Sequence, residues 1–125
     1  MVNIGDVFLV ADRLLNLPPE GDRKVYPDTQ PRPFVVLSFL NGPNPDLPTV
    51  LGCPISSETT RWTPLCVKLG AGEAGLNRKS WIRIPALQPV AKTDLPPSKM
   101  LGRLPQDKLE VAQKRILVYL GLSDG

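Results

Sequence analysis

Histidine is absent from the 125 residues of this chain. Its absence removes the side chain that most often acts as a general base near neutral pH, and it removes most kinds of zinc site. Cysteine is nearly absent too: Cys53 and Cys66 each lie inside an apolar run, far from a CxxC spacing. We interpret both as reduced core residues, and we predict no disulfide, no metal site and no cofactor.

The chain also lacks an apolar run long enough to cross a bilayer. Its first apolar stretch, VFLVADRLLNL (7–17), is interrupted by Asp12 and Arg13, and no basic segment typical of a signal peptide precedes it. We therefore expect a cytoplasmic protein without membrane association. The net charge of +3 is small, so it permits a polyanionic partner without requiring one.

Proline, in contrast, is abundant, and fifteen prolines divide the chain into short apolar runs. We predict β-strands within residues 6–15, 33–40, 49–56, 64–69 and 80–90. Apolar and polar residues alternate from Ser80 to Ile84, which favours a small closed or half-closed antiparallel barrel. The length of the chain suits a single domain, 1–125.

The segment PQDKLEVAQKRILVYLG (105–121) has the period of an α-helix. Its apolar residues recur three or four positions apart, at Leu109, Ala112, Ile116 and Leu120. Gly121 can cap the end of such a helix. We expect the apolar stripe to pack on the barrel, and we predict a shorter turn that begins at Ser98.

Two connections between the predicted strands are long. Residues 16–31, NLPPEGDRKVYPDTQP, are polar and rich in proline, and a connection of that length is typical of a functional lid or of a mobile hairpin tip. The second, GAGEAGLNRK (70–79), contains three glycines. It lacks both the motif of a nucleotide phosphate loop and a helix after it, so we do not expect it to bind a nucleotide.

Arg32 stands between two prolines at the start of a predicted strand. Pro31 and Pro33 restrict the chain on both sides of it, so the backbone of the arginine is held nearly rigid.

The order of these segments resembles the MazF/PemK/Kid family of toxin ribonucleases over almost the whole chain. The resemblance is carried by Gly5-Asp6, the block from Arg32 to Ser38, Pro54 with Ser56, and the GRL sequence before the terminal helix. It implies a mainly β fold, a small SH3-like barrel of the CcdB/Kid/MazF type with a C-terminal α-helix. It also implies a homodimer, a cognate antitoxin, and metal-independent endoribonuclease activity on single-stranded RNA.

The resemblance places the catalytic arginine at Arg32 and a catalytic hydroxyl at Ser56. Metal-independent cleavage needs a base for the 2′-hydroxyl, stabilisation of the phosphorane and a proton for the leaving 5′-oxygen. The Arg32 guanidinium can grip two phosphate oxygens at once, and the Ser56 hydroxyl can orient the phosphate. We predict a 2′,3′-cyclic phosphate and a 5′-hydroxyl as the new ends.

The general base is not identified by the resemblance. Some members carry a carboxylate two residues after the arginine that corresponds to Arg83, where this chain has Pro85. The family's histidine before the catalytic arginine is replaced by a proline. The candidate substitutes are Asp28, which is close enough in sequence to approach Arg32, and Glu20.

RNA binding requires positive charge together with stacking surfaces. The candidate contacts are Arg61, Trp62, Arg78, Lys79 and Arg83. We interpret Trp81 as a barrel or dimer residue rather than a stacking platform, because aromatic side chains dominate cores and interfaces.

Two alternative functions stay open. A CcdB-like gyrase poison shares the fold, but those toxins carry a tryptophan close to the C-terminus, whereas this chain ends LGLSDG. A catalytically decayed SH3-like module, which binds RNA or a protein partner, is favoured by Pro85 and by the missing histidine, and disfavoured by Arg32 and Ser56.

Overall fold

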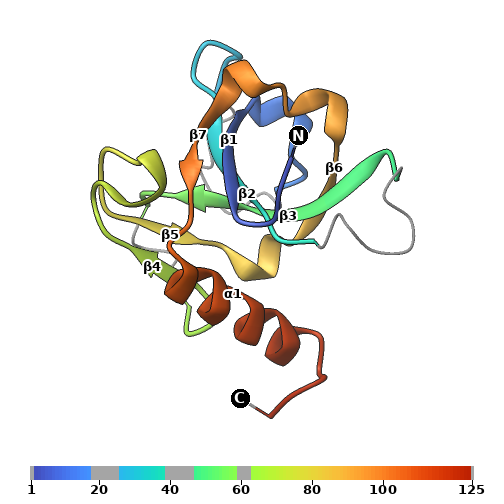
Figure 1. The fold of residues 1–125 in the computed structure, drawn as a ribbon, viewed down its shortest axis with the longest axis vertical. Helices are drawn as coiled ribbons and strands as arrows, with labels where there is room; N and C mark the ends of the chain where they lie inside the picture. The colour runs from blue at the N-terminus through green and yellow to red at the C-terminus, as the bar shows by residue number, and fades with distance from the viewer. Residues whose placement is uncertain (1, 18–25, 39–46, 59–62, 125) are drawn as a thin grey trace.

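The computed structural model describes residues 2–17, 26–38, 47–58 and 63–124. In Figure 1 a curled antiparallel sheet packs against one α-helix, α1 (Gln106–Tyr119). The strands are β1 (Asp6–Val10), β2 (Arg32–Val36), β3 (Thr49–Ser56), β4 (Val67–Leu69), β5 (Ser80–Ile82), β6 (Gln88–Ala91) and β7 (Met100–Arg103). They are ordered β4-β5-β3-β2-β1-β7, and β6 pairs with β3. This mainly β half-barrel with a C-terminal helix confirms the expected fold class.

Short 3-10 turns connect these strands. They are η1 (Asp12–Leu14), η2 (Glu73–Gly75), η3 (Ile84–Ala86), η4 (Lys92–Asp94) and η5 (Pro97–Lys99). In the described part of the chain, no helix has the length and apolar character that crossing a bilayer requires.

β3 joins the two halves of the sheet. Its first half pairs with β6 and its end pairs with β5, while β2 runs along its middle. Gly52 lies in this crowded stretch, where a Cβ would come within 2.2 Å of the Val35 carbonyl oxygen and 2.5 Å of the Phe34 ring. Only a residue without a side chain lets the strands approach so closely, which explains the glycine.

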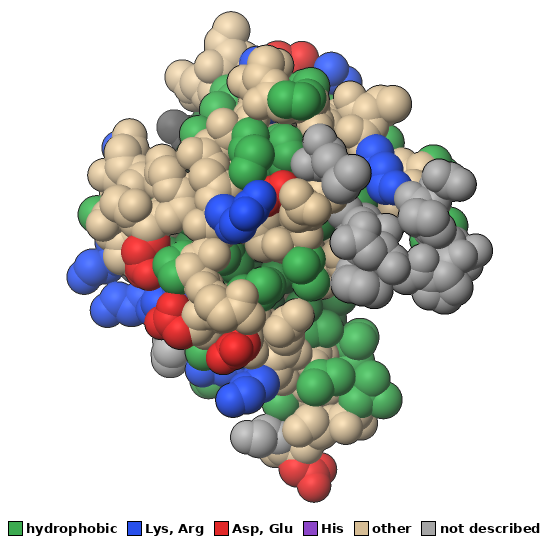
Figure 2. All heavy atoms as spheres, in the orientation of Figure 1, with side chains coloured by type: hydrophobic (Ala, Val, Ile, Leu, Met, Phe, Trp, Pro, Cys, Tyr) green, Lys and Arg blue, Asp and Glu red, His purple; other side chains and the backbone are tan. Residues whose placement is uncertain are grey.

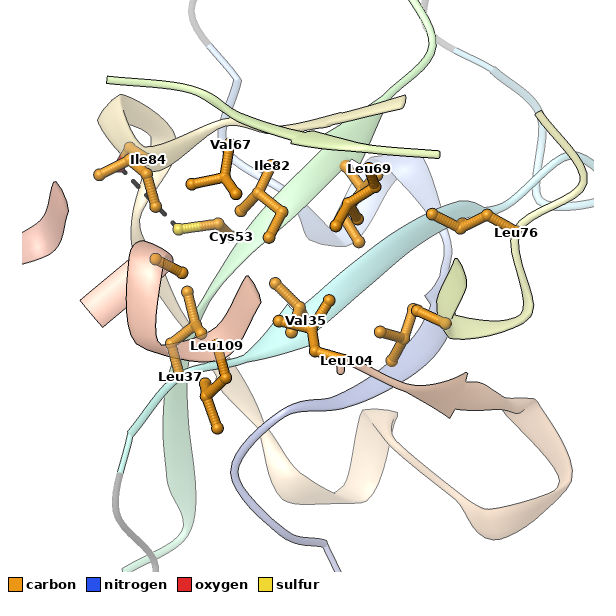
Figure 3. Packing of buried hydrophobic residues seen from close by; sticks show 14 residues of the cluster. Val35, Leu37, Cys53, Val67, Leu69, Leu76, Ile82, Ile84, Leu104 and Leu109 are labelled. Carbon is orange, nitrogen blue, oxygen red and sulfur yellow. Dashed lines mark hydrogen bonds between the residues drawn. The ribbon is translucent and has the colours of Figure 1, made fainter. Parts of the chain in front are cut away.

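Alternate residues of β1 and β2 face two separate apolar clusters, as the twofold period of a strand requires. Val7 and Val35 belong to the first, which Figure 3 shows between the sheet and α1. Phe8 and Phe34 belong to the second, together with Val10, Leu15, Val36, Val50, Val90 and Leu95. Both faces of the central strands are therefore buried.

The helix α1 covers the first cluster. Leu109 and Ala112 are buried in it, as the period predicted. Arg115 fixes the helix further along, because its Nη1 donates to the carbonyl oxygens of Pro64 at 2.6 Å and Cys66 at 3.0 Å.

The end of α1 confirms the predicted cap and corrects the predicted stripe. Gly121 has φ +76°, and its N–H donates to the Val118 carbonyl oxygen while that of Leu122 donates to Leu117. These two bonds form a Schellman motif. Leu120 was expected to pack on the barrel, but it is 54% exposed because the helix has already passed the edge of the first cluster.

Several strand predictions need correction. The strand expected over 80–90 is two strands, β5 and β6, separated by η3, because Pro85 has no N–H for a ladder. The first strand ends at Val10 and η1 follows. The turn expected at Ser98 is η5, but it leads directly into β7, a strand that we did not predict.

Both cysteines are free and buried, so the interpretation of each as a reduced core residue is confirmed. The Cys53 thiol lies 3.9 Å from the carbonyl oxygen of Ile84. Burial raises the pKa of Cys53 from its ordinary 9.0 to about 12, so the thiol stays protonated and unreactive.

Two of the sequence motifs meet at the start of β1. Asp6 accepts a bond from Arg103 Nε at 2.9 Å on one oxygen and from the Asn3 N–H at 2.8 Å on the other. Gly5, at φ +91°, accepts the Leu104 N–H through its carbonyl oxygen. The Gly5-Asp6 and GRL motifs therefore hold the first and last strands together, and their role here is structural.

Candidate active site

A buried carboxylate anchors the guanidinium of Arg32. Arg32 begins β2, and its Nε donates to Oδ1 of Asp12, in η1, at 2.7 Å. The Asp12 side chain is fully buried, whereas that of Arg32 is 16% exposed. The pair engages Nε and does not require either terminal nitrogen, so the outer edge of the guanidinium can meet an anion such as phosphate.

Tyr26 covers the same guanidinium. The Cζ atom of Arg32 lies 4.6 Å from the centroid of the Tyr26 ring, a cation–π distance. The backbone N–H of Tyr26 donates to Oδ2 of Asp12 at 2.7 Å. One carboxylate thus holds both the arginine and the aromatic residue stacked on it.

Ser56 lies at the end of β3, the strand that pairs with β2. The register of β2 and β3 pairs Phe34 with Pro54. Both strands continue for two residues beyond this pair, β2 to Arg32 and β3 to Ser56, so the two residues lie at the same end of the paired strands. Ser56 Oγ accepts the Glu58 N–H at 3.1 Å, which leaves its own hydrogen able to donate.

From Ser56, a row of side chains continues across β5 and β4. Trp81 is the cross-strand partner of Ser56 and of Lys68. Lys68 is exposed, and its Nζ lies 5.7 Å from the centroid of the Trp81 ring. Arg83 follows two residues after Trp81, at the end of β5, and its backbone N–H donates to the Pro54 carbonyl oxygen. A hydroxyl, an indole and a lysine therefore form a row across the sheet, and Arg32 begins the strand that pairs with β3.

Asp28 lies beside a different arginine from the one expected. Its Oδ2 accepts a bond from Arg13 Nε at 2.8 Å, and both side chains are largely exposed. The hydrogen bond and the charge of Asp28 raise the pKa of the Arg13 guanidinium above its ordinary value. The carboxylate bound to Arg32 is instead Asp12, and a catalytic role for Asp28 stays a prediction.

The remaining candidates fall into two groups. Arg78 and Lys79 are exposed in the segment between η2 and β5, and Ser80 Oγ donates to the Arg78 carbonyl oxygen at 3.0 Å. Arg61, Trp62 and Glu20 lie outside the described residues.

Three residues of the site were not singled out in the sequence: Asp12, Tyr26 and Lys68. Asp12 does carry a signal, since a carboxylate inside an apolar run has to be buried with a partner or turned to solvent. Tyr26 and Lys68 carry none, because their positions depend on a loop conformation and a strand register. Within the described ranges, no group of three His, Cys, Asp or Glu side chains could hold a metal ion.

The fold and the site can be compared with known proteins. A family model described as "PemK-like, MazF-like toxin of type II toxin-antitoxin system" matches residues 5–120. Among curated proteins, none matches the chain.

Solved structures share the fold over nearly their full length. An endoribonuclease in complex with its cognate antitoxin, from a mycobacterial species, has a TM-score of 0.70 at 15% identity, covering 98% of each chain. The toxin MazF-mt6 of Mycobacterium tuberculosis has 0.67 at 19% identity, covering 94% of this chain and 98% of that chain. A MazE-MazF structure from Deinococcus radiodurans has 0.67 at 18% identity, covering 98% of each. At such low identities the likeness shows the fold alone.

Proposed function

Because the chain belongs to the family of PemK-like and MazF-like toxins of type II toxin–antitoxin systems, we propose that it is a metal-independent endoribonuclease that cleaves single-stranded RNA. The observation that carries the proposal is the setting of Arg32. Its guanidinium is held at Nε by a buried carboxylate, and the strand that it begins is paired with β3, which ends at Ser56. A preorganised cation of this kind suits a phosphodiester.

The proposed reaction is a transesterification within the RNA. The 2′-hydroxyl oxygen attacks the adjacent phosphorus, the bond from phosphorus to the 5′-oxygen breaks, and that oxygen takes a proton from water, so that a 2′,3′-cyclic phosphate and a 5′-hydroxyl result. Arg32 stabilises the negative charge that builds on the non-bridging oxygens through its terminal nitrogens. Ser56 donates to one of those oxygens and keeps the attack in line.

Asp28 is the proposed base that accepts the proton of the 2′-hydroxyl. Its carboxylate is exposed, and Arg13 holds it in the segment that leads to Arg32. Asp12 is unsuited to this role because its side chain is fully buried and both of its oxygens accept hydrogen bonds. Glu20 is the alternative base.

The proposed path of the RNA follows the row of side chains across the sheet. Trp81, interpreted from the sequence as a barrel or dimer residue, is only half-buried, so we propose that it and Lys68 supply an aromatic surface and a positive charge next to Ser56. The further proposed contacts are Arg61, Trp62, Arg78, Lys79 and Arg83. Stacking and charge together are what single-strand binding requires.

The proposed partners are a cognate antitoxin and a second copy of the chain, in the cytoplasm. Two of the structures with this fold are toxin–antitoxin complexes. Figure 2 shows apolar side chains gathered beside the C-terminal end of α1. The exposed apolar residues there are Leu117, Tyr119, Leu120 and Leu122. A surface of this kind supports association with another protein chain.

The test is cleavage of a long single-stranded RNA in EDTA by the wild type and by Arg32→Ala. We expect discrete cuts with cyclic phosphate ends from the wild type, and a loss of about 10²–10³-fold in rate in the variant, as for other preorganised donors. Absence of cleavage by the folded wild type would contradict the proposal and would favour a binding module.

Arg103→Ala is the matched control. Arg103 also donates through Nε to a buried aspartate, at 2.9 Å, but it lies away from the site. Because each variant leaves a buried carboxylate without its arginine, both should lose stability. Circular dichroism and melting curves of the two proteins then separate a loss of fold from a loss of chemistry, and Arg32→Lys tests whether charge alone suffices.

A further inference from the structure

We propose that Asp12 is a positioning residue for RNA cleavage: its single carboxylate sets both the Arg32 guanidinium and the Tyr26 segment stacked on it. The inference rests on the proposed function, because it assigns the residue that prepares the cleaving arginine. Asp12 itself does not touch the RNA.

Because Asp12 is buried, its carboxylate can act only through its hydrogen bonds to neighbouring residues. The side chain is fully enclosed, so it cannot contact a substrate. Its two oxygens are divided between two elements: Oδ1 accepts from Arg32 Nε on β2, and Oδ2 accepts from the Tyr26 N–H in the preceding segment. A shift of this carboxylate would therefore move the arginine and its stacking partner together.

The Arg32 side chain needs such an anchor. Pro31 and Pro33 restrict its backbone, but several rotatable bonds separate the backbone from the guanidinium. The Asp12 bond fixes Nε, and the Tyr26 ring, whose centroid lies 4.6 Å from Cζ, restricts the rest of the guanidinium. What remains is the outer edge with the two terminal nitrogens, the fork that binds phosphate oxygens in a bidentate manner.

The chain contains a second pair of the same construction, which serves as an internal comparison. At the start of β1, Asp6 is fully buried, accepts from Arg103 Nε at 2.9 Å and accepts a backbone N–H on its other oxygen. The arginines differ: Arg103 is 61% exposed, whereas Arg32 is 16% exposed and covered by an aromatic ring. A buried aspartate that holds an arginine is thus common to both, and only Arg32 lies on a strand that pairs with β3, the strand that ends at Ser56.

The experiment compares Asp12→Asn with Asp6→Asn as full-length proteins. Three quantities are measured: the single-turnover cleavage rate on an RNA oligonucleotide, the Kd for the same oligonucleotide with a non-cleavable 2′-deoxy nucleotide at the scissile position, and the melting temperature. We expect both variants to melt earlier, while Asp12→Asn alone loses about 10²-fold in rate with Kd unchanged, since a small misplacement of a catalytic group has that effect. Equal rate losses in the two variants, or full activity of Asp12→Asn, would overturn the proposal.

Tyr26 supplies a second variant in case Asp12→Asn does not fold. Tyr26→Leu removes the ring over the guanidinium and should slow cleavage with Kd unchanged, whereas Tyr26→Phe keeps the ring and should lose much less of the rate. Equal rates for the two would contradict the arrangement.

A further measurement tests this inference independently of the proposed function. NMR follows the exchange of the Arg32 Nε hydrogen with solvent, and the signal is assigned by its loss in Arg32→Lys. We expect slow exchange in the wild type and faster exchange in Asp12→Asn. Slow exchange in a wild type that cleaves no RNA would reject the endoribonuclease and retain the anchoring of Arg32. Fast exchange in an active wild type would overturn the positioning role alone.

Discussion

Ser56 and Trp81 are direct cross-strand partners, where the end of β3 meets β5. The pairing brings a hydroxyl from one half of the sheet next to an indole from the other. The pairing of β5 with β4 puts the charged side chain of Lys68 on the other side of Trp81. The proposed catalytic end and the proposed RNA-binding end of the row are thus fixed by one set of strand pairings.

Replacing Ser56 by alanine should reduce RNA cleavage by about 10²–10³-fold, because a donor aimed at the phosphate is lost. The variant also loses the Oγ bond to the Glu58 N–H, which should lower the free energy of unfolding by about 0.5–1.5 kcal/mol. Single-turnover rates and urea denaturation measure the two effects. Ser57, which is exposed, provides the control: Ser57→Ala should leave the rate unchanged, and an equal loss there would remove Ser56 from the site.

Lys68→Ala should weaken RNA binding in a manner that depends on salt. If Nζ contacts one phosphate, the slope of log K against log salt should become shallower by about 0.7, the value for a single strand. Cleavage at saturating RNA should stay the same. Lys114, exposed on α1, is the matched control, and an identical slope for Lys114→Ala and Lys68→Ala would count against a specific path over β4.

Some parts of the fold and of the site were predicted from the sequence, and other parts were not. The strand at 49–56 and the glycine cap of α1 were predicted correctly because both depend on local patterns, a β-branched apolar run and a glycine after a periodic segment. Arg32 and Ser56 were nominated by resemblance; they lie on paired strands, β2 and β3, and their catalytic roles stay predictions. A separation of four residues suggested that Asp28 approaches Arg32, but the carboxylate bound to Arg32 is Asp12 of η1, and Asp28 binds Arg13. The proposed role of Asp28 as the base stays a prediction.

The burial of Cys53 should make stability fall at alkaline pH. Its thiol has a pKa of about 12 in the folded protein and an ordinary value of 9.0, so the unfolded chain binds fewer protons between those two values. The ionisation of this thiol therefore leaves the free energy of unfolding unchanged below pH 9. It lowers that free energy as pH rises from 9 toward 12, by at most about 1.4 kcal/mol per pH unit. Denaturant unfolding at pH 8 and pH 10 should show a smaller decrease in Cys53→Ala than in the wild type; equal decreases would contradict this.

Two glycines should respond differently to alanine. A Cβ at Gly102 would lie 2.8 Å from backbone atoms of Ala74, so Gly102→Ala must push β7 away from η2. At Gly121 nothing lies within 4 Å, and the penalty is only that of φ +76°, about 1 kcal/mol. Melting temperatures should therefore fall much further for Gly102→Ala. A larger fall for Gly121→Ala would mean that the helix cap matters more than the strand contact.

The pairing of the first strand with the last sets the time at which a newly made chain can become toxic. β1 pairs with β7, and Leu109 and Ala112 of α1 complete the first apolar cluster. A ribosome that has not yet delivered those residues holds a chain whose sheet is open at one edge and whose core is unfilled, although Arg32 and Ser56 were synthesised long before. The proposed nuclease activity should then arise only after α1 has been made, so the order of residues along the chain delays it well beyond the synthesis of Arg32 and Ser56.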